Sequence, residues 1–240
     1  YDFTPFKCGL LLTPHDPVHG EELWFTDGTR DGTRLVFEFV PGPEGGEPYN
    51  PVLVDGRAWF SALMPGAGRV LWQSDGTAEG TRPAFEKLQG EPAPIPEVAD
   101  WIAFQGVTFL SSITLEHGAE LWRTDPATGE SRLVRDIQPG PKGSNPRSFF
   151  EFEGQLYFVA EDGIHGAELW RSDGTEGGTA LAWDAYLGSA SGSPHGFAVN
   201  PPGDFAFIAT DSAQTTIHFY RSATRDFGKI GPPAGYGAPW

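Results

Sequence analysis

The sequence predicts an all-β fold, a single five-bladed β-propeller, from a fivefold repeat and from the strand-like composition of each repeat. An aromatic residue recurs at spacings of 48, 50, 48 and 50 residues. These anchors are Trp24, Trp72, Trp122, Trp170 and Tyr220. Repeats of about 40 to 50 residues with strand composition are typical of propeller blades. The 240 residues therefore predict one domain with blades at about 1–46, 47–95, 96–143, 144–192 and 193–240.

Each repeat is expected to form four short antiparallel strands, and the fourth repeat shows them most clearly. Its predicted strands are residues 147–152, 155–160, 168–172 and 180–183. Glu153-Gly154 and Asp173-Gly174 predict turns, because such pairs adopt positive φ at low cost. A linker rich in Gly, Ser and Pro over residues 188–194 leads to the next repeat. No segment has a sustained helical period, so we expect a helix content near zero.

The ends of the chain fit the same pattern. The first strand of the first repeat is expected near residues 3–6, and the fourth strand of the last repeat near residues 227–230. Residues 231–240 match the linker that precedes a first strand. We therefore expect the termini to meet at the closure seam between blades five and one, with Tyr236 or Trp240 packed across it. Closure of this kind removes exposed sheet edges.

Composition and charge exclude several classes of function. The net charge is −16, which argues against a nucleic-acid partner and against an anionic membrane surface. Cys8 is the single cysteine, so neither an intrachain disulfide nor a multi-Cys zinc site is possible. No apolar run approaches the roughly 18 residues that span a membrane. The start at Tyr1, without Met or signal peptide, leads us to expect a mature or trimmed fragment, and we expect a monomer.

The repeat contains a specific motif, Glu-Leu-Trp-x-x-Asp-Gly-Thr-x-x-Gly-Thr. Residues 22–33 and 168–179 carry it completely, Val70 replaces the Glu in the second repeat, and Pro126-Ala127 replaces Gly-Thr in the third. Across essentially the whole chain the sequence resembles the bacterial ELWxxDGT-repeat proteins, also called hyalin-like repeat proteins. That resemblance implies a repeat fold and a secreted, periplasmic or cell-surface protein. It implies no settled activity, so no catalytic residue can be transferred.

The two recurring elements of the motif each allow two interpretations. The recurring Trp could stack on a sugar, but packing of blade against blade is favoured because an aromatic side chain buries a large area. The Asp-Gly-Thr segment could bind calcium, but it lacks the series of oxygen ligands that such a loop needs. We therefore expect a turn at this segment.

Three histidines occupy one position of the repeat. His19, His117 and His165 are each followed by Gly and, one residue later, by Glu-Leu-Trp. Neutral imidazole suits zinc, copper or iron, so the three side chains are candidate ligands of a transition metal. The alternative is that this histidine belongs to the repeat consensus and hydrogen-bonds its own loop.

The entry to each first strand is the other candidate site. Alignment on the glycine of the first turn makes five positions equivalent to within one residue: Tyr1, Tyr49, Val98, Arg147 and His195. Varied side chains at one ring of positions indicate either ordinary loop variation or an asymmetric site. Tyr49, Arg147, His195 and Tyr1 are therefore predicted to bind a ligand. An anionic or polyhydroxyl ligand fits, since Arg binds carboxylates and sulfates while Tyr and His donate hydrogen bonds.

These observations favour a ligand-binding module over two alternatives. The favoured interpretation is a secreted or surface propeller that binds carbohydrate or another surface polymer. The second is an enzyme with one asymmetric site at the propeller axis, either a His–metal site or an acid–base site, and the divergence of repeats two and five supports it. The third is a plain protein-interaction scaffold. No catalytic motif is present, so catalytic residues remain unassigned.

Overall fold

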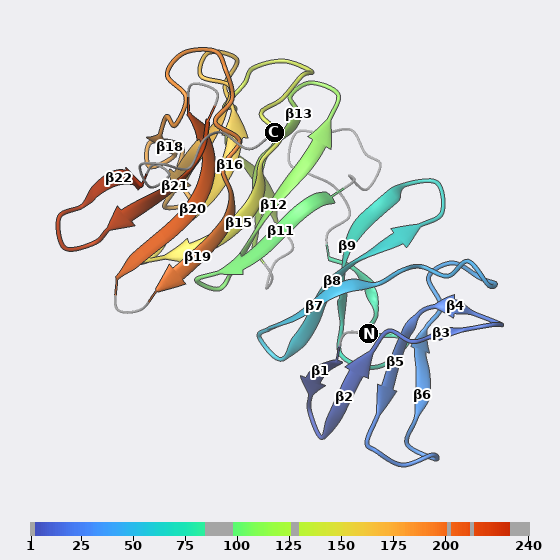
Figure 1. Cartoon of the computed structure of the whole chain (residues 1–240). Helices are drawn as coiled ribbons and strands as arrows, with labels where there is room; N and C mark the ends of the chain where they lie inside the picture. The colour runs from blue at the N-terminus through green and yellow to red at the C-terminus, as the bar shows by residue number, and fades with distance from the viewer. Residues whose placement is uncertain (1–2, 85–97, 126–129, 201–202, 212–213, 231–240) are drawn as a thin grey trace. The chain divides into compact units, whose positions relative to one another are not determined.

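The computed structural model describes residues 3–84, 98–125, 130–200, 203–211 and 214–230, and every regular element in these ranges is a β-strand (Figure 1). The strands form five four-stranded sheets and one two-stranded sheet. The chain falls into two compact units, Tyr1–Thr114 with Trp122–Leu133 and Leu115–Leu121 with Val134–Trp240. The expectation of an all-β chain is therefore confirmed for the described residues.

Each four-stranded sheet is built from strands of one repeat, and in sheets 2 to 5 the four strands are consecutive. Sheet 1 contains β1 (Phe3–Phe6), β2 (Gly9–Leu12), β5 (Leu23–Thr26) and β6 (Arg34–Phe37). Sheet 2 contains β7 (Tyr49–Val54), β8 (Arg57–Met64), β9 (Gly68–Ser74) and β10 (Arg82–Pro83). Sheet 3 contains β11 (Val98–Phe104), β12 (Val107–Thr114), β13 (Gly118–Thr124) and β14 (Ser131–Arg135).

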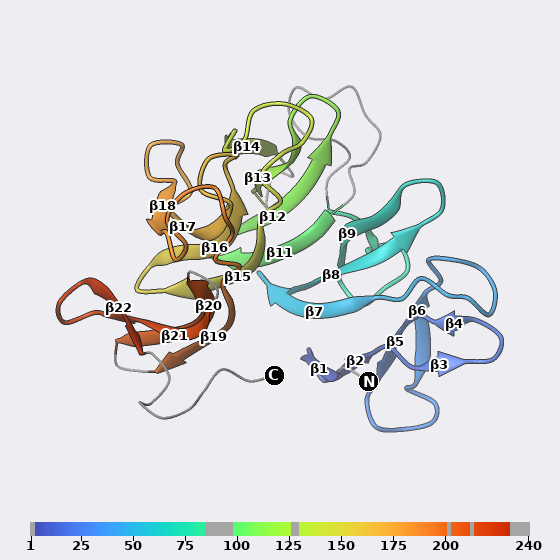
Figure 2. The ribbon, with the colours of Figure 1, turned by 45° about the horizontal axis from the view of Figure 1, so that its top comes forward.

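The last two sheets follow the same plan, and Figure 2 shows their strands side by side in chain order. Sheet 4 contains β15 (Arg147–Phe152), β16 (Gln155–Glu161), β17 (Ala167–Ser172) and β18 (Ala180–Trp183). Sheet 5 contains β19 (His195–Asn200), β20 (Asp204–Asp211), β21 (Gln214–Arg221) and β22 (Asp226–Ile230). The two-stranded sheet joins β3 (His15–Asp16) to β4 (Gly20–Glu21) within the first repeat.

The predicted strands agree closely with the observed ones. The four strands expected in the fourth repeat match β15 to β18 to within one residue at each end. Glu153 and Gly154 have φ of 48° and 73°, as a two-residue hairpin turn requires. Each sheet lies within one of the five expected blade ranges. Tyr236 and Trp240 lie outside the described residues, and the closure of five blades into a ring stays a prediction.

The cores lie between neighbouring sheets. Sheets 1 and 2 bury an apolar cluster in which Trp72 contacts Phe39 with ring centroids 4.8 Å apart. Sheets 2 and 3 bury another that contains Trp59, Trp101 and Trp122. Each Å² of apolar surface that is removed from water in these clusters stabilises the folded chain by about 25 cal/mol. Trp72 and Trp122 therefore pack sheet against sheet as predicted, and exposures of 5% and 1% leave no ring face for a sugar.

Three described linkers connect successive sheets by the same two backbone hydrogen bonds. In each linker, one backbone N–H donates to the carbonyl of the residue that precedes the motif glutamate position. The carbonyl of the preceding linker residue accepts a hydrogen bond from a backbone N–H on the second strand of the next sheet. The pairs are Glu47 N–Glu21 O with Leu63 N–Gly46 O, Asn145 N–Ala119 O with Glu161 N–Ser144 O, and Ser193 N–Ala167 O with Thr210 N–Gly192 O. These bonds fix where β7, β15 and β19 begin.

Candidate functional site

The Asp-Gly-Thr segments are turns held by their own side chains. In the fourth repeat, Asp173 Oδ1 accepts from Thr175 N at 2.9 Å and from Thr175 Oγ1 at 2.7 Å. The Thr175 hydrogen bonds lower the pKa of Asp173. A Cβ on Gly178 would lie 2.0 Å from Asp173 Oδ1, which explains the second glycine of the motif. The same contacts recur at residues 27–33 and 75–81, so the turn prediction is confirmed.

The glutamate of the motif is buried and anchors the linker to the next sheet. Glu22, Glu120 and Glu168 are all 0% exposed. Glu168 Oε2 accepts from Ala185 N at 2.8 Å, and Oε1 accepts from Gly192 N. Burial raises the pKa of Glu168 to about 7. Sequence reasoning did not assign this residue a role, because charged side chains are rarely buried.

The three repeat histidines are each bound to an aspartate. Nδ1 lies 2.8 Å from Asp16 Oδ2 in His19, 2.9 Å from Asp136 Oδ2 in His117 and 2.7 Å from Asp162 Oδ2 in His165. These hydrogen bonds raise the pKa of His19 and His165. In the first and fourth repeats, the aspartate three residues before the histidine was the overlooked sequence signal.

The histidine contacts agree with the consensus-loop interpretation. Asp162 Oδ1 also accepts from the backbone N–H groups of Ile164 and His165, so the aspartate, the histidine and the loop form one structure. Within the described ranges no three His, Cys, Asp or Glu side chains are placed to hold a metal ion. The transition-metal site of His19, His117 and His165 stays an untested prediction.

The predicted ring of strand-entry positions has a common backbone geometry. Each described member starts its strand, pairs with the second strand of its sheet and is followed by a register shift, a β-bulge. The pairs are Tyr49–Ser61, Val98–Ser112, Arg147–Val159 and His195–Ile208. The equivalence of these four positions is therefore confirmed, while Tyr1 lies outside the described residues.

The side chains at these positions differ in exposure. Val98 is 1% exposed and belongs to the core, whereas Tyr49 is 65% exposed. Arg147 Nη1 donates to Asn145 O at 3.1 Å, and His195 Nδ1 lies 2.9 Å from Ser193 O. Tyr49 belongs to one compact unit, and Arg147 and His195 belong to the other. Their role as ligand-binding residues stays a prediction.

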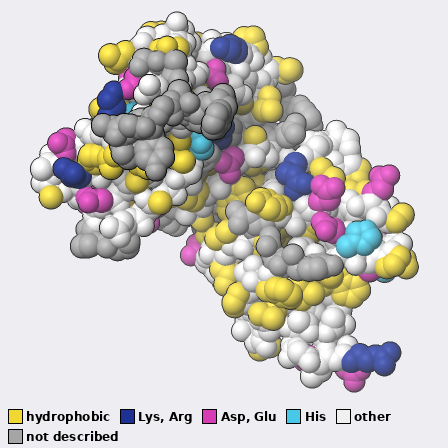
Figure 3. All heavy atoms as spheres, viewed as in Figure 1, with side chains coloured by type: hydrophobic (Ala, Val, Ile, Leu, Met, Phe, Trp, Pro, Cys, Tyr) yellow, Lys and Arg dark blue, Asp and Glu magenta, His cyan; other side chains and the backbone are white. Residues whose placement is uncertain are grey.

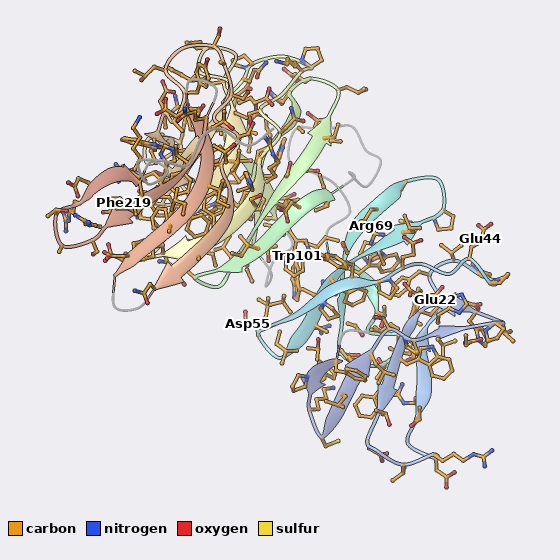
Figure 4. All side chains as sticks on the ribbon, viewed as in Figure 1. Glu22, Glu44, Asp55, Arg69, Trp101 and Phe219 are labelled. Atoms are coloured by element: carbon orange, nitrogen blue, oxygen red, sulfur yellow. The ribbon has the colours of Figure 1, made fainter. Side chains whose placement is uncertain are left out.

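Sequence reasoning missed Arg69, which lies at the loop end of sheet 2 (Figure 4). Its guanidinium donates to the carbonyl of Glu47 at 2.9 Å and to Glu47 Oε2 at 3.0 Å. Figure 3 shows basic, acidic and apolar side chains interspersed on the face in view. The available signal was the second repeat's departure from the motif at Arg69-Val70.

No protein-family model and no curated protein sequence matches the chain. Solved structures do match. A puromycin hydrolase has a TM-score of 0.57 at 17% identity, over 96% of this chain and 37% of the hydrolase. A putative TolB from Agrobacterium tumefaciens has a TM-score of 0.51 at 11% identity, over 92% of this chain and 76% of its own.

A third match is the extracellular domain of a putative one-component system from B. thetaiotaomicron. Its TM-score is 0.55 at 12% identity, over 97% of this chain and 27% of its own. The chain thus spans little more than a third of the hydrolase. At these identities the likeness concerns the fold alone, and it supports a β-propeller-like architecture. Within the described residues, no helix has the length and apolar character to cross a bilayer.

Proposed function

We propose that the chain is a ligand-binding β-propeller that recognises carbohydrate or another surface polymer, with sheets 1 to 5 as the five blades of one closed ring. Support for the ring comes from the fivefold repeat and from one four-stranded sheet per repeat. Support for a binding role comes from the propeller-like solved structures, because propeller loops and strand ends commonly form ligand sites.

One observation carries the binding proposal. The starts of β7, β15 and β19 share one backbone geometry, yet carry Tyr49, Arg147 and His195. The Trp and Asp positions of the motif, by contrast, keep one residue type in the first four repeats. A ligand without fivefold symmetry makes a different contact at each equivalent position, and different polar side chains there can provide those contacts. A hydroxyl-rich or anionic polymer fits their hydrogen-bonding capacity.

The proposal includes a location outside the cytoplasm and a monomeric state. Two of the similar structures are a putative TolB and an extracellular domain, which supports a secreted or surface protein. A surface location would place polysaccharides within reach of the chain.

Binding to an array of polysaccharides tests the proposal directly. We expect Tyr49→Ala, Arg147→Ala and His195→Ala each to weaken binding of the polymer that the unaltered chain retains. Leu53→Ala is the matched control, because Leu53 is 47% exposed on β7 and lies toward the opposite end of that strand. Equal binding by all four variants would reject the strand starts as the site.

The enzyme alternative is favoured by the local divergence of sheets 2 and 5, where Val70 and His218 replace the buried glutamate. Elemental mass spectrometry of protein purified without tag or chelator tests its metal-dependent form. About one transition metal per chain, lost on His117→Ala or His165→Ala, would favour the enzyme. Metal content that these substitutions leave unchanged would reject the histidine site.

A further inference from the structure

Sheet 2 differs from sheets 1, 3 and 4 near the start of its third strand, β9. The residues at the start of the motif are Glu21-Glu22, Ala119-Glu120 and Ala167-Glu168 in sheets 1, 3 and 4. Sheet 2 has Arg69-Val70 instead, and Val70 is 0% exposed. The carboxylate anchor is therefore lost there, and a cationic side chain is gained one residue earlier. Packing does not require this cation, because alanine suffices at the same position in sheets 3 and 4.

Arg69 is held in a defined orientation by the linker that precedes β7. Nη1 donates to Glu47 O at 2.9 Å, and Nη2 lies 3.0 Å from Glu47 Oε2. Nη1 also lies 3.4 Å from Ser61 O. Glu47 itself has a φ of 48°, a backbone conformation that costs a non-glycine residue energy. The Arg69 side chain remains 27% exposed and that of Glu47 56% exposed, so solvent reaches both charged groups.

Tyr49 lies on the same face of sheet 2 as Arg69. Tyr49 pairs with Ser61 on β8, and Arg69 pairs with Leu63 on β8. Ser61 and Leu63 are two residues apart on one strand, so their side chains point to the same face, as do those of their cross-strand partners. The Ser61 carbonyl that Arg69 approaches is thus directly beside the start of β7. An exposed aromatic ring and a partly exposed ion pair therefore lie on one face of sheet 2, with β8 between their strands.

These groups form a recognition surface with a particular chemical preference. Arg69 supplies several N–H donors in one plane, Glu47 supplies carboxylate acceptors, and Tyr49 supplies both a ring face and a hydroxyl. The ion pair is electrically neutral, so neither an anion nor a cation gains a net Coulomb attraction from it. A ring with several hydroxyl groups uses the donors, the acceptors and the aromatic face together.

We propose that Tyr49, Arg69 and Glu47 form a subsite for a neutral sugar ring of a polysaccharide. The inference rests on the proposed function and specifies its ligand class. Arg69 and Glu47 bind two neighbouring hydroxyl groups, and Tyr49 covers the apolar face of the ring. The net charge of −16 further disfavours polyanionic polymers at this position.

Isothermal titration of the full chain with neutral hexasaccharides of glucose, mannose and xylose, and with oligogalacturonate as the anionic comparison, tests the subsite. We expect a neutral oligosaccharide to bind, and Tyr49→Ala, Arg69→Met and Glu47→Gln each to weaken it by roughly tenfold. Arg82→Met is the matched control, because Arg82 is an exposed arginine of the same sheet on β10.

The variants also separate binding from folding. The Tyr49 side chain is 65% exposed, so Tyr49→Ala should lose affinity with an unchanged unfolding midpoint. Neutral-sugar binding that survives these three substitutions but is lost in Arg147→Ala or His195→Ala would overturn the subsite and leave the proposed function standing. Preference for oligogalacturonate would also overturn the subsite. Binding of none of these saccharides, and of nothing on the polysaccharide array, would overturn both.

Discussion

Glu168 is an ionisable side chain in a fully buried position, where such residues are rare unless they are paired. Its partners are backbone N–H groups of Ala185 and Gly192, both in the linker between sheets 4 and 5. Carboxylate acceptors satisfy these buried donors, whereas an apolar side chain would leave them unpaired at a cost of about 1–3 kcal/mol each. The motif glutamate Glu168 therefore stabilises the connection between sheets 4 and 5.

Truncation of this side chain should be strongly destabilising. We expect Glu168→Ala to lower the free energy of unfolding by roughly 2–4 kcal/mol, because both N–H groups lose their acceptor and a cavity forms. Glu168→Gln keeps one oxygen acceptor and should cost less. Urea denaturation measures both variants. A loss below about 0.5 kcal/mol in Glu168→Ala would contradict the anchoring role.

The pKa of Glu168 predicts how its contribution depends on pH. Burial raises this pKa to about 7, from an ordinary value of 4.5. The folded chain therefore binds the proton more tightly than the unfolded chain. The stabilising contribution is complete below pH 4.5 and is lost as the pH rises through about 7. From pH 8 to pH 5, the unaltered chain should gain up to about 3 kcal/mol relative to Glu168→Gln, and a pH-independent difference would contradict this.

The pKa values of two histidines should be shifted in opposite directions from the ordinary value of 6.5. The Asp162 hydrogen bond raises the pKa of His165, whereas burial lowers the pKa of His218. Proton NMR titration of the ring signals measures both in one sample. Asp162→Asn should lower the pKa of His165 and leave that of His218 unchanged. An unaltered His165 titration would show that the contact at 2.7 Å does not persist in solution.

At the scale of the element, the Asp-Gly-Thr loop depends on contacts between side chain and backbone. Gly177 and Gly178 are adjacent, yet only the second faces an obstacle. A Cβ on Gly178 would lie 2.0 Å from Asp173 Oδ1, whereas a Cβ on Gly177 meets nothing within 4 Å. Gly178→Ala should therefore displace Asp173 and cost roughly 1–3 kcal/mol. Gly177→Ala should be neutral or stabilising by up to about 1 kcal/mol, and equal effects in thermal unfolding would contradict the loop geometry.

The strands could be predicted from sequence because their signals are local. Residues 180–183 lie between a glycine-rich turn and a glycine-rich linker, and β18 has those bounds. Side-chain partners were harder to predict, since they depend on the register between distant strands. Asp162 and His165 are three residues apart and their pairing was visible in the sequence, but His117 meets Asp136 nineteen residues away. Arg69 and Glu47 are 22 residues apart, and they come into contact because β7, β8 and β9 pair side by side.

At the scale of the whole molecule, the sheets are linked in chain order by equivalent backbone contacts. The linker bonds of sheets 1 and 2 recur between sheets 3 and 4 and between sheets 4 and 5. A repeat chain with open ends would behave as a series of neighbouring units, whose unfolding need not be cooperative. A closed ring, as we propose, makes each blade depend on two neighbours. Cooperativity of unfolding therefore distinguishes the closed ring from two separately stable units.

Matched substitutions in the two compact units test this cooperativity. Gly32 and Gly178 occupy the same place in the first and fourth repeats, and a Cβ at either would lie 2.0 Å from the aspartate of its own loop. In a closed ring, Gly32→Ala and Gly178→Ala should each shift one shared unfolding transition by similar amounts. Differential scanning calorimetry measures the number of transitions and their midpoints. Two transitions, one responding to Gly32→Ala and the other to Gly178→Ala, would contradict closure, because blades locked in one ring cannot unfold in independent halves.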